Sequence, residues 1–346
     1  MPNKPRIGIV GCGIISDLLL EGARCAGISV AAVCDMEKEK AKRAALPFGA
    51  QVYGDYHQML ERANLDGVIV ALPSHLHFEA ARDALDAGKH VFCEKTMTNS
   101  VQDSLKLARK AGRSGRVFQM GYMKRFNPAF AALKQNLGRI APVTNATLRL
   151  TITSDPVLSG RKSRPSSWHS DVRKVGGGFL VHSGSHLLDL MMFYFGLPDC
   201  AWGTLSRDVN GNEFANDFLF RMRSGLFVNM QLLMTRARGF SHAGSEWEEK
   251  VEINGLNGRL SGEDADWMGK IPSRAFLHLA DGQGPKALFT LWESQWAEEL
   301  KAFVQGIREG RCLGSSAADG YRVDYILSRL KRFEKGKAIL KFHFAL

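Results

Sequence analysis

The chain has 346 residues, of which 45% are hydrophobic and 23% charged, and its formal net charge is +11. This composition excludes a disordered or fibrous chain, and the length favours two domains over a single core. The first residues contain no apolar leader, and no apolar run could cross a bilayer, so we expect a cytoplasmic protein without membrane contact.

Lysine and arginine are spread along the chain without a dense block, which argues against a nucleic-acid partner. A basic surface that attracts anionic cofactors and metabolites is the simpler interpretation. Six cysteines lie apart without a CxxC pair, a pattern typical of free thiols in a reducing compartment.

The first 120 residues alternate short apolar runs with helical patterns. Predicted strands, rich in β-branched residues, are 6–11, 29–35, 66–72, 90–95 and 116–121. Residues 77–90 place apolar side chains on one helical face, and Gly88 marks the helix end. Strand followed by helix, repeated, predicts an α/β fold with a doubly wound parallel sheet.

The first predicted strand runs into Gly11-Cys-Gly13-Ile-Ile-Ser16, and a helical pattern follows. Gly11 permits a tight turn, and Gly13 lets a pyrophosphate approach the N–H groups of the helix N-terminus. Asp35 follows the second strand about 20 residues further on, where a carboxylate can accept hydrogen bonds from a ribose. This context predicts a dinucleotide site. A glycine turn with a helix-capping aspartate is the structural alternative.

The carboxylate of Asp35 favours NAD, because it would repel the 2′-phosphate of NADP. Lys38 or Lys40 could still reach such a phosphate, so NADP stays possible. For His77, the alternative to a cofactor contact is that it simply begins a helix. The residues expected beside the cofactor by position are Ile14, Ile15, Leu72, Pro73 and His77.

After residue 121 the pattern changes to longer strands and short turns. Predicted strands are 143–153, 217–223, 226–234 and 249–255, with a hairpin signal at Ser224-Gly225. Predicted helices are 183–195, 293–309 and 316–333. We expect a dinucleotide-binding domain over 1–122 and an α/β domain over 123–346 with a mostly antiparallel sheet. The C-terminal helices could pack back onto the first domain.

Residues 176–189, GGGFLVHSGSHLLD, place His182 and His186 four positions apart, which predicts one helical face. Such a pair could be part of a zinc site, but no glutamate base lies between them, and we expect no metal. A buried, hydrogen-bonded core pair is a second alternative. An acid/base role in an enzyme is the third alternative for the two histidines.

Five segments resemble a known family and together span nearly the whole chain. They are VIVALPSHLHFEAARDALDAGKHVFCEK (68–95), MGYMKRFNPAF (120–130), GGGFLVHSGSHLLDLMMFYFG (176–196), NGLNGRLSG (254–262) and FVQGIREGR…SAADGYRVDYILSRL (303–330). In these segments the chain resembles the glucose–fructose oxidoreductase / inositol dehydrogenase / rhizopine catabolism family, abbreviated Gfo/Idh/MocA. The resemblance implies an N-terminal Rossmann domain, an open-faced C-terminal sheet often used for oligomerisation, and NAD(P)-dependent oxidation of sugars, cyclitols or their derivatives.

The family's Glu-Lys-Pro motif is Glu94-Lys95-Thr96 here, and the resemblance implies that Lys95 is catalytic or orients the substrate. It makes His186 the general base or the hydrogen-bond partner of the reacting hydroxyl, with Lys95 assisting. His182 replaces a family aspartate and supplies no negative charge. We therefore expect a lower Lys95 pKa than in the family arrangement and easier binding of an anionic or carbonyl-bearing substrate.

The resemblance implies further contacts. Glu94 is expected at the nicotinamide ribose, with a structural salt bridge as the alternative. Asp189 could orient the His186 imidazole, although we favour a structural role. The expected substrate-side residues, for which core aromatics and solvated cations are the alternatives, are Tyr122, Arg125, Trp168 and His169.

The leading functional hypothesis is an NAD(P)-dependent oxidoreductase that oxidises a ring hydroxyl of a sugar or cyclitol, with Lys95 and His186 as the acid/base pair. We expect a homodimer or homotetramer formed through the C-terminal sheet. One alternative is an enzyme that keeps NAD bound and recycles it during glycoside cleavage, elimination or epimerisation through a keto-sugar. Another is a non-catalytic NAD-binding sugar sensor.

Overall fold

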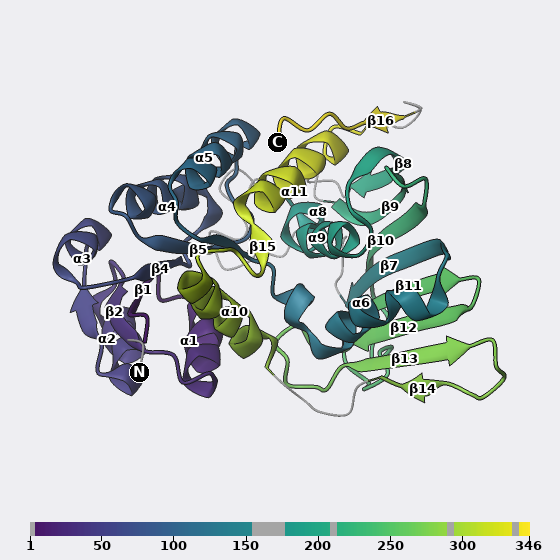
Figure 1. Cartoon of the computed structure of the whole chain (residues 1–346), viewed down its shortest axis with the longest axis horizontal. Helices are drawn as coiled ribbons and strands as arrows, with labels where there is room; N and C mark the ends of the chain where they lie inside the picture. Colours follow the sequence, from purple (N-terminus) through teal and green to yellow (C-terminus); the bar gives the residue numbers. More distant parts are fainter. Residues whose placement is uncertain (1–3, 154–176, 208–212, 289–293, 334–338) are drawn as a thin grey trace.

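The computed structural model describes residues 4–153, 177–207, 213–288, 294–333 and 339–346, and two sheets organise them (Figure 1). Sheet A contains, in spatial order, β15 (Ser315–Ser316), β6 (Phe118–Gly121), β5 (His90–Glu94), β4 (Gly67–Val70), β1 (Ile7–Val10), β2 (Val30–Cys34) and β3 (Gln51–Tyr53). All its pairs are parallel except β15 with β6. The predicted doubly wound parallel sheet is confirmed, and its order 3-2-1-4-5-6 is that of a Rossmann fold.

Both faces of sheet A are buried, which explains its continuous apolar runs. Ile7 and Ile9 of β1 belong to one hydrophobic cluster, and Val10 belongs to the other. The helices of this region are α1 (Ile14–Cys25), α2 (Lys38–Ala45), α3 (Tyr56–Arg62), α4 (His77–Asp86) and α5 (Val101–Arg113). The sequence prediction missed β3, because its three residues are at least partly exposed and give no apolar signal.

Sheet B contains, in spatial order, β14 (Lys286–Ala287), β13 (Arg274–Leu279), β12 (Gly258–Asp264), β11 (Trp247–Gly255), β7 (Val143–Thr153), β10 (Phe227–Thr235), β9 (Glu213–Met222), β8 (Pro198–Arg207) and β16 (Leu340–Lys341). Only β7 and β10 pair in parallel among its described strands. The predicted mostly antiparallel sheet is confirmed. The Ser224-Gly225 turn joins β9 to β10, with Gly225 at φ 89°.

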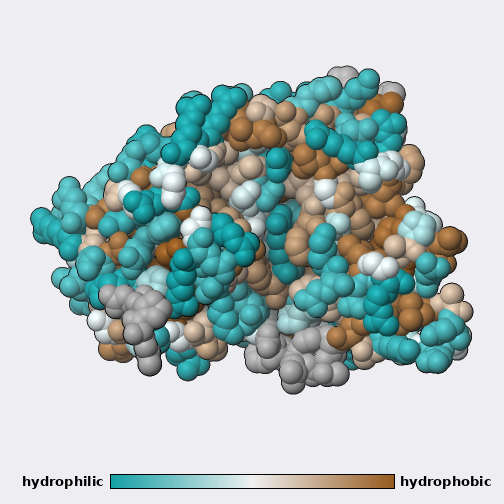
Figure 2. Space-filling view, viewed as in Figure 1, coloured by the Kyte–Doolittle hydropathy of each residue, from teal (hydrophilic) through white to brown (hydrophobic). Residues whose placement is uncertain are grey.

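One face of sheet B packs against helices, and the opposite face bears exposed apolar side chains. The helices that pack against sheet B are α6 (Pro128–Ile140), α8 (Phe179–His182) and α9 (Gly184–Phe195). Along β9, Phe218 and Phe220 are buried whereas Leu219 is exposed, as strand alternation requires. Phe227 and Leu233 of β10 are also exposed, and hydrophobic residues gather over the sheet B side in Figure 2.

The C-terminal helices pack back onto sheet A's helices, as the sequence allowed. In Figure 1, α10 (Gln295–Glu309) lies beside α1, and α11 (Ala317–Leu330) lies beside α5. A Cβ atom on Gly22 of α1 would come within 2.8 Å of the Trp296 backbone, so glycine permits this close packing. No helix among the described residues is long and apolar enough to cross a membrane.

Candidate functional site

A cavity of about 1300 Å³ lies where the carboxyl ends of the parallel strands face sheet B. Its wall includes Gly11 and Lys95 from the sheet A half, and His186 and Glu249 from the sheet B half. In doubly wound folds, ligands bind at this end of the sheet, where the strand order reverses. The topology therefore assembles one site from residues that lie far apart in the sequence.

The glycine turn after β1 has the geometry that a pyrophosphate requires. Gly11 has φ +93°, and a Cβ atom there would come within 2.5 Å of the Ala71 carbonyl oxygen, so only glycine fits. Gly13 is the N-cap of α1, and nothing lies within 4 Å of where its Cβ would be. The buried Ser16 hydroxyl donates to the Gly13 carbonyl at 2.8 Å, so the residue in place of a third glycine is satisfied internally.

Asp35 is fixed at the expected ribose position. One carboxylate oxygen accepts a hydrogen bond from the Cys12 amide at 2.8 Å, and the other accepts one from the Glu37 amide at 2.8 Å. These bonds hold the carboxylate at the cavity wall. The residues of the first half thus fit a dinucleotide: a glycine turn at a helix N-terminus and an oriented acid.

Most of the other expected cofactor residues line the cavity, namely Ile14, Ile15, Leu72, Pro73 and Glu94. His77 does not line the cavity; it begins α4, as the structural alternative expected. Its side chain is buried, with Nδ1 2.8 Å from the Thr96 carbonyl and Nε2 2.6 Å from the Leu72 carbonyl. His77 therefore links the loop after β4 to the loop after β5.

Lys95 lies directly after β5, on the cavity wall. Its Nζ donates a hydrogen bond to the backbone carbonyl of His182 at 2.9 Å, which joins the two halves of the site. Burial lowers the pKa of Lys95 to about 8, and the neighbouring Glu94 opposes the shift. Burial also raises the pKa of Glu94 to about 7, against the effect of Lys95. The Lys95–Thr96 peptide bond is cis.

The two histidines lie on different helices, which corrects the expectation of one helical face. His182 ends α8 and His186 belongs to α9, with Ser183 between them. The glycines and serines of this stretch have low helix propensity, which explains the interruption. Both histidines nevertheless line the cavity. No group of His, Cys, Asp or Glu in the described segments is arranged to hold a metal ion.

His186 has the features of an uncharged acceptor. Burial lowers its pKa well below the ordinary value, and the charges of Lys95 and Lys124 add to that shift. Its Nδ1 is buried and has no hydrogen-bond partner among the described residues. The Tyr122 ring packs edge-on against the imidazole, with ring centroids 6.0 Å apart.

Tyr122 and Arg125 were expected to contact substrate, but neither lines the cavity. Tyr122 is 1% exposed and supports His186 from behind. The Arg125 guanidinium donates two 2.7 Å hydrogen bonds to Asp189, which also accepts one from Ser315 at 3.0 Å. The favoured structural role of Asp189 is thus confirmed. Trp168 and His169 lie outside the described residues.

Sequence reasoning missed the two carboxylates that pair with Lys124 on the sheet B side. The Lys124 ammonium is buried 2.6 Å from Glu249 and 2.6 Å from Asp264, and both Lys124 and Glu249 line the cavity. Trp247 and Trp267 also line it. One signal was available: Glu249 shares the strand face of Val251 and Ile253, and an acid on an apolar face requires a partner.

Comparisons with known proteins agree with this architecture. Residues 5–122 match the family described as "Oxidoreductase family, NAD-binding Rossmann fold", and residues 138–261 match the "GFO/IDH/MocA C-terminal domain". Inositol 2-dehydrogenase 1 of Saccharopolyspora erythraea is 33% identical over 339 residues, covering 91% of this chain and 90% of that protein. Inositol 2-dehydrogenase of Acidothermus cellulolyticus is 26% identical over 332 residues, covering 91% and 88%. The structure of levoglucosan dehydrogenase in complex with NADH and L-sorbose has the same fold, with a TM-score of 0.84 at 20% identity and 97% and 98% coverage.

Proposed function

The chain belongs to the Gfo/Idh/MocA family of NAD-binding oxidoreductases, and from this premise we propose that it is an NAD-dependent dehydrogenase of a sugar, cyclitol or sugar derivative. The observation that supports the proposal most strongly is that Lys95 and His186, from opposite halves, line one cavity with the glycine turn. Residues 1–122 would bind the dinucleotide, and residues 123–346 would supply the substrate side. The names of the similar dehydrogenases support a ring CH–OH as the reacting group.

Gly11, Gly13 and Asp35 would hold NAD⁺, which would supply the hydride acceptor for the carbinol carbon. The protein's own task is to take the hydroxyl proton and to position the ring. Neutral Lys95 is the stronger base of the pair, because the pKa of His186 is held well below its usual range. His186 would accept a hydrogen bond from the reacting hydroxyl and align it, while Lys95 takes the proton.

A substrate screen tests this proposal. Free sugars, cyclitols, uronates and glycosides would be supplied with NAD and, in parallel, with NADP, while NADH absorbance and product identity are followed. We expect NADH and a keto product in equal amounts, with NAD preferred because of Asp35. Product without NADH, from protein that purifies with bound nucleotide, would favour the recycling alternative instead. Ligand binding without any turnover would favour the sensor.

The rate should depend on pH through Lys95. Because the base must be neutral, kcat/KM should rise with pH through about 8, the pKa of Lys95, and level off above it. His182→Asp would add a negative charge near the ammonium and raise that pKa, so the acidic limb should move to higher pH. An acidic limb that stays in place in the variant would contradict a role for position 182.

We also propose that the exposed face of sheet B mediates self-association into a dimer or tetramer. Leu219, Phe227 and Leu233 lie exposed on adjacent strands of that face. Leu219→Asp should shift the mass measured by analytical ultracentrifugation toward the monomer, because a buried carboxylate without a partner opposes association. Leu256→Asp, at an exposed turn, is the control. Equal masses for both variants and the parent would reject this surface.

A further inference from the structure

Two side chains of β11 that line the cavity, Trp247 and Glu249, carry buried polar atoms without hydrogen-bond partners in the described part of the chain. Trp247 Nε1 and Glu249 Oε1 are both buried, and neither has a hydrogen-bond partner among the described residues. Both residues line the cavity, and their i, i+2 spacing places them on the same face of the strand. A buried donor and a buried acceptor left unsatisfied cost free energy, which a bound ligand can recover.

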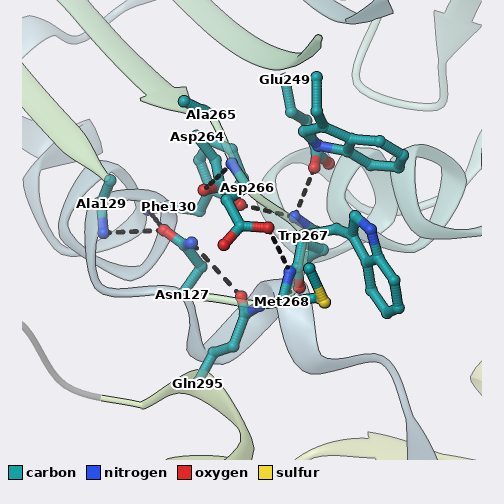
Figure 3. A network of polar contacts seen from close by, with 12 residues as sticks. Asn127, Ala129, Phe130, Glu249, Asp264, Ala265, Asp266, Trp267, Met268 and Gln295 are labelled. Carbon is teal, nitrogen blue, oxygen red and sulfur yellow. Dashed lines mark hydrogen bonds and ion pairs between the residues drawn. The ribbon is translucent and has the colours of Figure 1, made fainter. Parts of the chain in front are cut away.

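The buried ammonium of Lys124, which also lines the cavity, holds Glu249 in place. Lys124 Nζ lies 2.6 Å from Glu249 Oε2 and 2.6 Å from Asp264 Oδ2, so one ammonium faces two carboxylates. Figure 3 shows Glu249 and Asp264 converging on this point. The cluster therefore has no excess positive charge with which to bind an anionic group. Glu249 Oε1, by contrast, suits a neutral hydroxyl donor.

Aromatic rings form the adjacent wall. The Trp247 and Trp267 ring centroids are 6.5 Å apart. The Trp267 segment is held firmly: its carbonyl accepts a 2.9 Å hydrogen bond from Gln295, and Asp266 accepts one from the Met268 amide at 3.0 Å (Figure 3). Rigid aromatic faces of this kind pack well against the C–H face of a ring and need little ordering on binding.

We propose that Trp247 and Glu249 determine substrate specificity by binding the ring end remote from the reacting carbon. That end would be uncharged and would carry neighbouring hydroxyls, one donating to Glu249 and one accepting from Trp247 Nε1, with a C–H face against the tryptophans. A carboxylate or phosphate at this end would be rejected. This inference rests on the proposed dehydrogenase function, because Lys95 and His186 define the reacting end.

The test combines steady-state kinetics on whichever neutral polyol is oxidised with calorimetry on the NADH-loaded protein. The calorimetric probes are myo-inositol, levoglucosan and glucuronate. We expect Glu249→Gln to raise KM and the polyol Kd about 10- to 100-fold, with kcat changed less than about threefold. Trp247→Phe, which keeps a ring but removes the N–H, should raise KM about three- to tenfold. Both variants should bind NADH as the parent does.

Glu252→Gln is the matched control, because Glu252 lies on the same strand but its side chain pairs with Arg259 at the surface. If KM and Kd of both variants stay within about twofold of this control while turnover is found, the inference fails and the dehydrogenase function stands. If no probe is turned over but Glu249→Gln weakens polyol binding, the inference stands and the function fails. Absence of both turnover and polyol binding, or a preference for glucuronate, overturns the inference.

Discussion

Lys95→Ala is expected to lower kcat by about 10²- to 10⁴-fold, the usual effect of removing a positioned proton acceptor. The proposed role is supported by position: Lys95 follows β5 at the cavity wall, and its Nζ reaches across to the His182 carbonyl at 2.9 Å. Its pKa of about 8 makes the neutral form available near physiological pH. Stopped-flow measurement of NADH formation under single-turnover conditions would isolate the chemical step from product release.

Two comparisons separate proton transfer from a structural effect. Lys106→Ala removes an exposed lysine of α5 and should leave kcat unchanged. Ethylamine added to Lys95→Ala should restore part of the rate, because a small amine can enter the vacated space and accept the proton. A kcat within tenfold of the parent would contradict the assignment of Lys95. Lost activity together with lost NADH binding would instead indicate a damaged cofactor site.

Asp189→Asn is expected to destabilise the protein by about 3–5 kcal/mol, because it leaves a buried guanidinium without its ionic partner. The Asp189 side chain is fully buried and accepts two hydrogen bonds from Arg125. Asp319 lies 3.8 Å from the Arg125 guanidinium and would compensate part of its charge. We therefore expect a loss near the lower end of this range. Urea unfolding followed by circular dichroism would measure the effect as a lowered midpoint.

Asp199→Asn is the matched control, since Asp199 forms the same kind of pair with Arg221 on the exposed surface. Exposed pairs contribute little, so the control should change the free energy of unfolding by less than about 1 kcal/mol. Equal changes in the two variants would show that burial does not decide the strength of the Asp189–Arg125 pair. Because Asp189 also connects α9 to β15, its loss should loosen the helix that bears His186.

The sequence by itself indicated one parallel and one mostly antiparallel sheet, the glycine turn and the residues at the carboxyl ends of the strands, although β3, β8, β12 and β13 were not predicted. Period-two patterning and β-branched runs specify strands locally, and Gly11 stands between a predicted strand and a predicted helix, a context that indicates a glycine turn. The family resemblance added Lys95 and His186. Each of these features depends on a short stretch of chain, so the local sequence pattern is enough to predict it.

Only the tertiary structure decided which polar residues face the cavity. Arg125, His77 and Tyr122 resembled ligand contacts in the sequence, but packing turned them toward Asp189, two backbone carbonyls and the His186 ring. Lys124 and Glu249, 125 positions apart, meet because η3 (Met123–Phe126) and β11 converge beside the cavity. A charge is buried only where a distant partner compensates for its lost hydration, and that partner is set by topology rather than by neighbours in the chain.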